Sequence, residues 1–99
     1  MIYSIPLQPV PAQTVTCTLS GRQISLWLRQ LSTGVYLDVR MNGQPLIMGA
    51  LCLNGVDLIR NAASLLPGKL YFTDTQGKED PYYDGVGERF ILNYDDGAV

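Results

Sequence analysis

The sequence contains no histidine, and that absence excludes several kinds of chemistry. A Ser-His-Asp triad or a Cys-His pair needs an imidazole to accept the proton of its nucleophile. Metal sites with a histidine ligand are excluded for the same reason. We therefore expect neither of these catalytic arrangements, and no histidine-ligated metal, in this chain.

Cysteine is scarce as well. Cys17 and Cys52 lie far apart in the sequence and form no spacing typical of a metal site. Both fall on core-facing positions of predicted strands, where a thiol packs as a small apolar group. The N-terminus has no basic segment followed by an apolar run, so no signal peptide is predicted. Cytoplasmic synthesis and free thiols are the expectation.

The sequence also has few charged residues and no long apolar run. Charged residues make up 16% of the chain against 46% hydrophobic residues, and the net charge is −2. Because there is no cluster of Lys and Arg, binding to nucleic acid or to a membrane surface is disfavoured. No apolar run approaches the ~18–20 residues that would cross a membrane. A small chain with so little charge leaves apolar area on its surface, which favours an oligomer or a larger assembly.

The chain of 99 residues is expected to form one domain, residues 1–99. Residues 1–12 are predicted to form an extended arm, because the prolines in this stretch fix φ and remove backbone donors. This arm is either a docking arm or a loose lead-in. Residues 95–99 are expected to be a frayed tail.

Apolar and polar residues alternate with the period of a β-strand through most of the chain. The expected strands cover 14–19, 24–29, 35–41, 46–53, 69–73 and 88–94, with a further extended segment at 56–59. A helical turn is expected at 60–66. The fold class predicted by this pattern is all-β, a small antiparallel barrel or sandwich of about seven or eight strands.

Two turns fix how neighbouring strands pair. Asn42-Gly43 is a strong hairpin signal and predicts a two-residue type I′ turn. A uniform register from this turn pairs Met41 with Gln44, Val39 with Leu46, Leu37 with Met48 and Val35 with Ala50. The turn at 31–34 pairs Leu28 with Leu37 and Leu26 with Val39 on the core side, and Arg29 with Tyr36 and Trp27 with Asp38 on the reverse side. Turn chemistry and core pattern agree, which supports this meander.

The reverse side of this predicted sheet is apolar too. Ile47, Leu51 and Leu53 point away from the core in the predicted register. A strand that is apolar on both faces is covered on both faces. The cover is either the rest of the chain, such as the proline arm or the segment 60–68, or another subunit.

Aromatic residues suggest what this reverse side does. Trp27 and Tyr36 lie on it together with Arg29, and buried interface anchors are enriched in Trp, Tyr and Arg. Trp27, Tyr36, Tyr82 and Tyr83 could instead stack on sugars or bases. Contacts with another protein chain are the preferred interpretation.

A polar loop of about fourteen residues, 74–87, separates the last two predicted strands. Loops longer than ~12–15 residues are uncommon and are usually functional or disordered. Pro81, Tyr82 and Tyr83 supply bulk and several glycines supply turns, so a long structured loop is predicted. Five carboxylates lie in or beside it: Asp74, Glu79, Asp80, Asp84 and Glu88. The loop is either the working part of the protein or a rigid clip that touches a neighbour.

Two kinds of chemistry could use these carboxylates. Ca²⁺ takes about six to eight oxygen ligands, but Gln76 and Lys78 occupy positions where an EF-hand loop supplies them. Glycoside hydrolysis needs two carboxylates in a cleft that raises one pKa, and nothing in the sequence predicts such a cleft. A solvated, turn-forming loop is preferred, so no metal, no cofactor and no enzymatic activity are predicted.

Several short motifs together are typical of one known family. They are Ile5-Pro6-Leu7, Pro9-Val10-Pro11, Ile24-Ser25-Leu26, Arg29-Gln30-Leu31, Tyr36-Leu37-Asp38-Val39, Asn42-Gly43, Gly49-Ala50-Leu51-Cys52-Leu53, Phe72-Thr73-Asp74-Thr75-Gln76-Gly77, Asp80-Pro81, Tyr83, Gly85, Gly87 and Arg89-Phe90. In these motifs, which span nearly the whole chain, the sequence resembles the small baseplate plug family of contractile-tailed bacteriophages, of the cyanophage type.

The resemblance implies a structural virion component without catalytic residues. Such a protein would sit on the tail axis near the hub and close the tube end in a symmetric ring. It would be made in the cytoplasm of the host bacterium and assemble in the tail baseplate with copies of itself and with other tail or hub proteins. The expected interface residues are Trp27, Arg29, Tyr36, Ile47, Leu51, Pro81, Tyr82 and Tyr83.

Two other functions stay open from the residues alone. The first is a monomeric β-barrel that binds a ligand or glycan at Tyr82 and Tyr83 without catalysis. The second is a nucleic-acid-binding barrel, which the acidic balance disfavours. The state of association separates them, because only the structural role requires an assembly.

Overall fold

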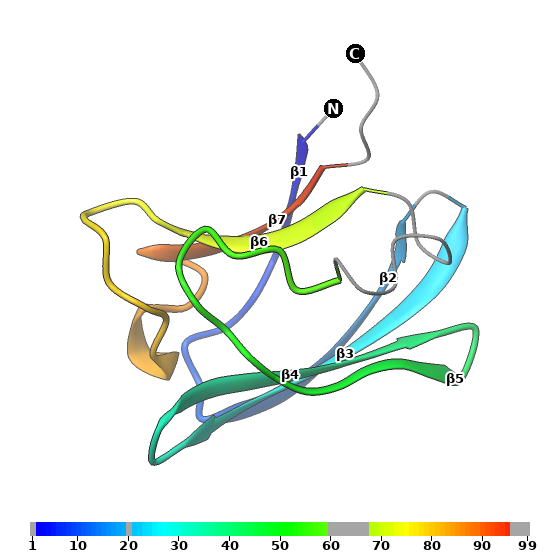
Figure 1. The fold of residues 1–99 in the computed structure, drawn as a ribbon, viewed down its shortest axis with the longest axis horizontal. Helices are drawn as coiled ribbons and strands as arrows, with labels where there is room; N and C mark the ends of the chain where they lie inside the picture. The colour runs from blue at the N-terminus through cyan, green and yellow to red at the C-terminus, as the bar shows by residue number, and fades with distance from the viewer. Residues whose placement is uncertain (1, 20, 60–67, 96–99) are drawn as a thin grey trace.

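The computed structural model describes residues 2–19, 21–59 and 68–95 of the chain (Figure 1). Their strands are β1 (Ile2–Ile5), β2 (Ala12–Leu19), β3 (Arg22–Leu31), β4 (Gly34–Met41), β5 (Gln44–Leu51), β6 (Lys69–Asp74) and β7 (Phe90–Asp95). A short 3₁₀ helix, η2 (Tyr83–Gly85), lies between the last two strands. The predicted all-β class is confirmed. No helix of the described residues is long and apolar enough to span a membrane.

The strands form two antiparallel sheets, one in the order β2-β3-β4-β5 and the other in the order β1-β7-β6. Figure 1 shows them as two layers that face each other. The sheets are not joined into a closed barrel, so the sandwich describes this fold better than the barrel does. Packing one sheet on the other places a single core between them.

The core is built from alternate residues of the facing strands, as the period of two requires. The three-stranded sheet contributes Leu70, Phe72, Phe90, Leu92 and Tyr94, all fully buried. The four-stranded sheet contributes Ile24, Leu26, Leu28, Val35, Leu37 and Val39 from its two central strands. Cys52 belongs to the same cluster and Cys17 packs against it, as predicted for both thiols.

The turns that the sequence predicts are present. Asn42 and Gly43 have φ of 52° and 82°, the positive values that a type I′ turn needs at both central positions. Met41 pairs with Gln44 across this turn. The β3–β4 register is also as predicted: Leu28 faces Leu37, Leu26 faces Val39, Arg29 faces Tyr36 and Trp27 faces Asp38.

The uniform register predicted between β4 and β5 is wrong beyond the first pair. The observed pairs are Met41–Gln44, Arg40–Pro45, Val39–Ile47, Leu37–Ala50 and Tyr36–Leu51, with register shifts on both sides of Val39. The cause is local. Gly49 adopts a φ of 64°, and its N–H donates to Asp38 Oδ1 at 2.6 Å, so β5 bulges around the carboxylate.

The first of the two shifts, between Pro45 and Ile47, moves Ile47 to the other side of the sheet. Ile47 faces Val39 and packs against the core, so its predicted place on the reverse side is wrong. Leu51 faces Tyr36 and stays on the reverse side. An extra residue in one strand inverts the facing of every residue after it, which is why a single missed bulge changes the assignment.

The N-terminal arm is a strand at its start. β1 pairs with β7, and Ile5 and Leu7 are buried in the core, so residues 2–7 are not a loose lead-in. Asp95 ends β7, so the predicted tail begins one residue too early, and 96–99 lie outside the described residues. The segment 56–59 runs beside β6 without forming a strand. The predicted helical turn at 60–66 also lies outside the described residues.

Candidate functional site

The outward side of the four-stranded sheet carries a cluster of large side chains that we call the outer face: Trp27, Arg29, Leu31, Tyr36 and Leu51. They occupy alternate positions of β3 and β4 and the end of β5, so strand periodicity places them all on the same side. Trp27 and Leu31 are each 47% exposed, and Leu51 is 38% exposed. Their apolar area faces away from the core and has no cover among the described residues.

Arg29 orders the centre of the outer face. Its guanidinium carbon lies 4.5 Å from the centre of the Trp27 ring, a cation–π contact. Its Nη1 atom lies 3.1 Å from Asp38 Oδ1, and Asp38 is buried beneath it. The same Nη1 is buried and has no aligned hydrogen bond, so its attraction to Asp38 is electrostatic. The indole is therefore held in place before any partner arrives.

Tyr36 completes this surface at the edge nearer β5. Its hydroxyl is 2.6 Å from Thr33 Oγ1, which fixes the ring above the β3–β4 turn. The Leu51 side chain lies against the same turn, since a Cβ added to Gly34 would be 2.9 Å from Leu51 Cδ1. Four of the predicted interface residues, Trp27, Arg29, Tyr36 and Leu51, thus share one surface.

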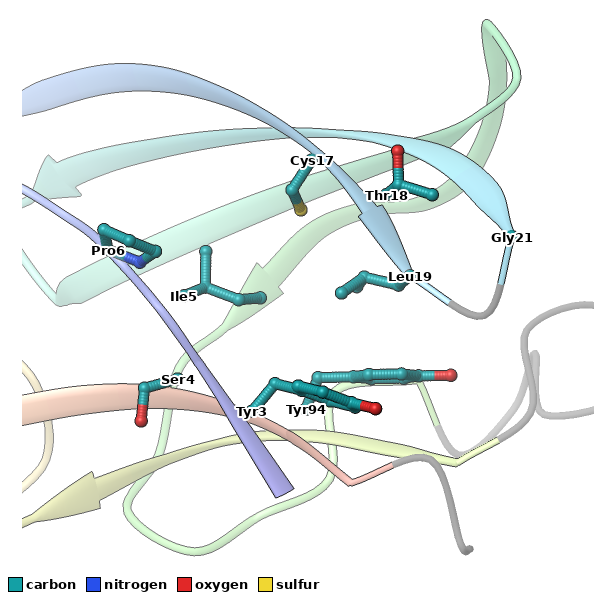
Figure 2. A pocket seen from close by; sticks show the side chains of 9 residues that line it. All are labelled: Tyr3, Ser4, Ile5, Pro6, Cys17, Thr18, Leu19, Gly21 and Tyr94. Carbon is teal, nitrogen blue, oxygen red and sulfur yellow. The ribbon is translucent and has the colours of Figure 1, made fainter. Parts of the chain in front are cut away.

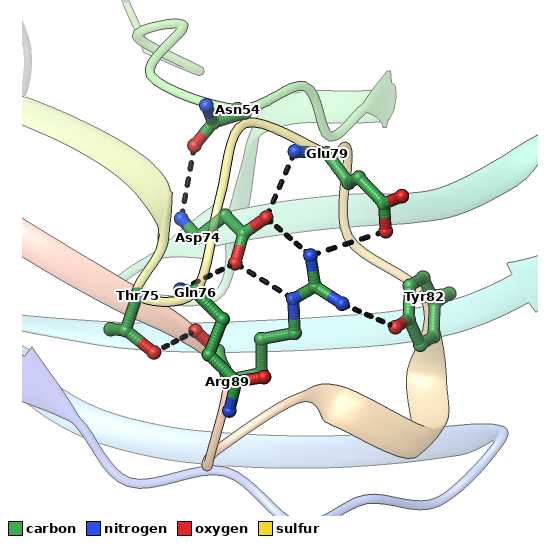
Figure 3. Close-up of polar contacts among 7 residues, drawn as sticks. All are labelled: Asn54, Asp74, Thr75, Gln76, Glu79, Tyr82 and Arg89. Atoms are coloured by element: carbon green, nitrogen blue, oxygen red, sulfur yellow. Dashed lines mark hydrogen bonds and ion pairs between the residues drawn. The ribbon is translucent and has the colours of Figure 1, made fainter.

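The 75–89 loop is organised by one ion pair, Asp74 with Arg89 (Figure 3). Arg89 Nε and Nη2 each donate to one carboxylate oxygen of Asp74 at 2.8 Å, a bidentate arrangement. The backbone N–H groups of Gln76 and Glu79 donate to the same two oxygens at 2.9 Å. Asp74 is only 7% exposed, so its charge needs partners within the chain. The donors from Arg89, Gln76 and Glu79 supply them.

These contacts shift both ionisation equilibria. The hydrogen bonds from Arg89, helped by those from the two backbone amides, hold the pKa of Asp74 well below its usual range, against the opposing effect of burial. Asp74 in turn raises the pKa of Arg89 further above its ordinary value. Both groups therefore stay charged at every physiological pH. Neither is suited to exchange a proton with a substrate.

Two other carboxylates of the loop also have partners within the chain. Glu79 Oε2 lies 3.2 Å from Arg89 Nη2, and Asp80 Oδ1 accepts the N–H of Asn54 at 3.0 Å. No group of acidic side chains within the described residues has the geometry to hold a metal ion. Three of the five carboxylates that suggested a cation site, Asp74, Glu79 and Asp80, thus bind one arginine or one neighbouring turn.

Tyr82 belongs to the same network. Its hydroxyl accepts a hydrogen bond from Arg89 Nη1 at 3.0 Å. Its ring packs edge-on against the ring of Phe90, with 4.7 Å between the ring centres. Pro81 is buried, so it shapes the loop and does not form surface as predicted. Tyr83 is 39% exposed, and its N–H donates to Gln30 Oε1 at 3.0 Å. That bond ties the loop to β3 one residue beyond Arg29.

Close backbone packing keeps the loop rigid at its end. Gly87 adopts a φ of 88°, and a Cβ added there would collide with the carbonyl oxygen of Leu7. At Gly85 an added Cβ would lie 2.7 Å from the Phe90 ring. Both positions therefore require glycine. The prediction of a structured loop between the last two strands is confirmed.

A cleft of about 470 Å³ opens between β1 and β2 (Figure 2). It is lined by Tyr3, Ser4, Ile5, Pro6, Cys17, Thr18, Leu19, Gly21 and Tyr94. Burial raises the pKa of Cys17, and it raises the pKa of Cys52 to about 12, so both thiols are protonated near neutral pH. Tyr82 and Tyr83, the residues expected to bind a glycan, do not line this cleft.

Sequence reasoning missed the polar residues that hold these surfaces. Arg89 was not recognised as the partner of Asp74, because the residue that pairs with Asp74 across the loop is Phe90. Asn54 and Gln30, which anchor the loop through side-chain oxygens, give no pattern that a sequence displays. The amide of Gly49 donates to the Asp38 carboxylate. In the sequence this contact is visible only as a glycine within a strand, which is a known bulge signal.

Fold and surface together define a small all-β protein whose distinctive features are an exposed apolar sheet face and a rigid, internally neutralised loop. No curated protein matches the chain. The family model described as "Cyanophage baseplate Pam3 plug gp18" matches residues 2–97, and the chain belongs to that family. The predicted resemblance is thus confirmed. The family is a structural plug of a phage tail baseplate, which implies a location in the virion tail and contacts with other tail proteins.

Proposed function

We propose that this protein is made in the cytoplasm of the host bacterium, assembles on the tail axis of the baseplate and closes the tube end there through contacts with copies of itself and with hub proteins. The outer face is its principal contact surface. The observation that carries this proposal is the half-exposed Trp27, held in place by Arg29 in a chain that belongs to the baseplate plug family. Preordered Trp and Arg side chains are the usual anchors of protein interfaces.

The Arg29 side chain also supports contact at this face. Its Nη1 lies 3.1 Å from Asp38 Oδ1, so the guanidinium is already held in place when it presents the Trp27 ring to a partner. Tyr83 is exposed, but it is bonded to Gln30, which alternates with Arg29 and lies on the other side of β3, so the tip of the loop forms a separate surface. Tyr82 is tied to Arg89 and Phe90 and serves the loop instead.

The test is incorporation of a Trp27→Ala variant into baseplates. We expect the amount of plug protein per particle, or its affinity for isolated hub, to fall by roughly 30-fold, as for a central interface anchor. The variant should keep the circular dichroism spectrum of the parent. Quantitative mass spectrometry of purified particles measures the incorporation.

The matched control is Ile2→Ala, which removes an exposed apolar side chain from the other sheet. Incorporation of this control should equal that of the parent chain. Normal incorporation of the folded Trp27→Ala variant would contradict the proposal. Tight binding of a glycan array by a strictly monomeric protein would favour the ligand-binding alternative.

A further inference from the structure

The free edge of β2 differs from the other sheet edges. β2 pairs only with β3 among the described strands. The N–H of Gln30 donates to the carbonyl of Pro11 at 2.7 Å, which makes 11–30 a hydrogen-bonded pair and sets the alternation along β2. Thr14, Thr16 and Thr18 therefore direct both N–H and C=O away from β3. All three residues are exposed.

Two of the other edges carry the usual protection against pairing with another chain. β5 contains Pro45 and the bulge around Gly49, which interrupt a regular ladder. β1 has only four residues and is followed directly by Pro6. Neither edge offers a long, regular row of donors and acceptors.

The edge of β6 is occupied by the chain itself. The N–H of Leu58 donates to the Leu70 carbonyl at 2.6 Å, and the N–H of Gly55 donates to the Phe72 carbonyl at 2.8 Å. Asp74 N–H donates to the side chain of Asn54 at 3.0 Å. The segment after β5 thus closes this side of the sandwich.

Within residues 2–19, 21–59 and 68–95, nothing gives β2 any of these protections. It runs for eight residues in unbroken register with β3, and it contains no charged residue, no proline and no glycine. Natural proteins seldom leave such an edge open, because it is a template for strand pairing. The sandwich is also open on this side, where the cleft between β1 and β2 lies (Figure 2).

We propose that β2 pairs antiparallel with β2 of a second copy of this chain, with Thr16 opposite Thr16 on the two-fold axis. Thr14 then faces Thr18 of the other copy, and about six ladder hydrogen bonds form between the two edges. The two four-stranded sheets become one continuous sheet. Val15 faces Cys17 of the other copy on the core side, and Cys17 lines the cleft.

A second copy fits this edge because the edge is self-complementary. An isologous contact places each residue against its own symmetry-related partners, so any charge near the axis meets a like charge. β2 has no charge to repel its copy. Threonines at alternate positions face threonines, a favourable cross-strand pair. This inference goes beyond the proposed function and concerns the free protein, since a two-fold contact does not generate a ring about the tail axis.

The test compares Thr16→Pro with Thr16→Val in the full chain. The N–H of Thr16 points away from β3, so proline there spares the fold, as proline does on an edge strand. It removes both hydrogen bonds of the central pair, and the dimer should weaken by roughly 30-fold or more. Thr16→Val keeps the backbone donor and should remain dimeric. Light scattering over a concentration series gives the dissociation constants, and circular dichroism verifies the fold.

Cysteine cross-linking tests the register. Cys17→Ser leaves Cys52, 1% exposed, as the native thiol. In that background Thr16→Cys should form a disulfide-linked dimer on mild oxidation. Thr14→Cys should not, because its two copies would lie about 14 Å apart along the strands. A mixture of Thr14→Cys and Thr18→Cys chains should cross-link as a heterodimer.

Each contrary result overturns the inference in a distinguishable way. A wild-type chain that stays monomeric across the series has no β2–β2 pair. A Thr16→Pro chain that dimerises like wild type uses another surface, such as the outer face, and the proposed function survives. If the wild-type chain is monomeric and Thr16→Pro abolishes its binding to the hub, then β2 pairs with a strand of another protein. Equal cross-linking at 14 and 16 rejects the register.

Discussion

The outer face and the 75–89 loop differ in how their most conspicuous groups are satisfied. The loop contains most of the carboxylates that attract notice in the sequence, yet Asp74, Glu79 and Asp80 all have partners within the chain. The outer face has little charge, yet Trp27 and Leu51 have no apolar cover from the residues that the structure describes. Polar groups that are fully paired stabilise a fold, whereas uncovered apolar groups mark a contact surface.

The largest expected effect breaks the loop. Arg89→Met leaves the buried carboxylate of Asp74 without its cation, and a buried unpaired charge is strongly destabilising. We expect the melting temperature to fall by roughly 10 °C or more. Thermal unfolding followed by circular dichroism measures it. Arg40→Met, at an exposed arginine, is the control and should change little.

A second substitution sharpens this result. Asp74→Asn in the Arg89→Met background removes the unpaired carboxylate charge, so the double variant should recover part of the lost stability. If Arg89→Met unfolds at the same temperature as the parent chain, the loop does not depend on the ion pair. The 75–89 loop would then not be a region that internal charge pairing stabilises, and it would not differ from the outer face in this respect.

Acid should weaken the loop before it affects the outer face. The pKa of Asp74 is lowered in the folded chain, so its contribution to stability is fully present above the ordinary Asp pKa of about 3.9 and is lost as pH falls toward the lowered value. Wild type should therefore exceed Asp74→Asn in unfolding free energy at pH 7, and this advantage should shrink below about pH 4. Urea unfolding of both proteins from pH 7 to pH 2 measures the difference. An advantage that stays constant across this range would show that Asp74 does not titrate with folding.

The smallest expected effect is on the stability of Trp27→Ala. The indole is half exposed and packs on Arg29, so its loss should change the free energy of unfolding by only about 1 kcal/mol. Denaturant unfolding with an unchanged m-value measures this. A much larger loss would mean that Trp27 is a structural residue, and the defect in incorporation would then need no interface to explain it.

What the sequence predicts well is the part of the fold where turn chemistry and alternation agree. The β3–β4 pairs and the Asn42-Gly43 turn are found as predicted, because local residues determine both. The β4–β5 register failed because two shifts interrupt it, one before Ile47 and one at the bond between Asp38 and Gly49, and no alternation pattern contains either. Ile47 was therefore placed on the wrong side.

The candidate site was predictable to a similar extent. Trp27 and Tyr36 were assigned to one surface because they lie at alternate positions of strands whose register was correct. The role of the loop was not predictable, since Asp74 meets Arg89 across the whole loop and Asn54 reaches it from another part of the chain. Long-range polar pairing leaves no periodic signal in the sequence.

The most direct test of the central claim is radical footprinting of Trp27 in the free protein and in assembled baseplates, read by mass spectrometry. The account predicts that oxidation of the Trp27 indole falls several-fold on assembly, since an interface anchor becomes fully desolvated. Tyr3, exposed on the other sheet, provides an internal reference. Equal oxidation of Trp27 in the free and assembled protein would show that the outer face stays in solvent, and would contradict the account.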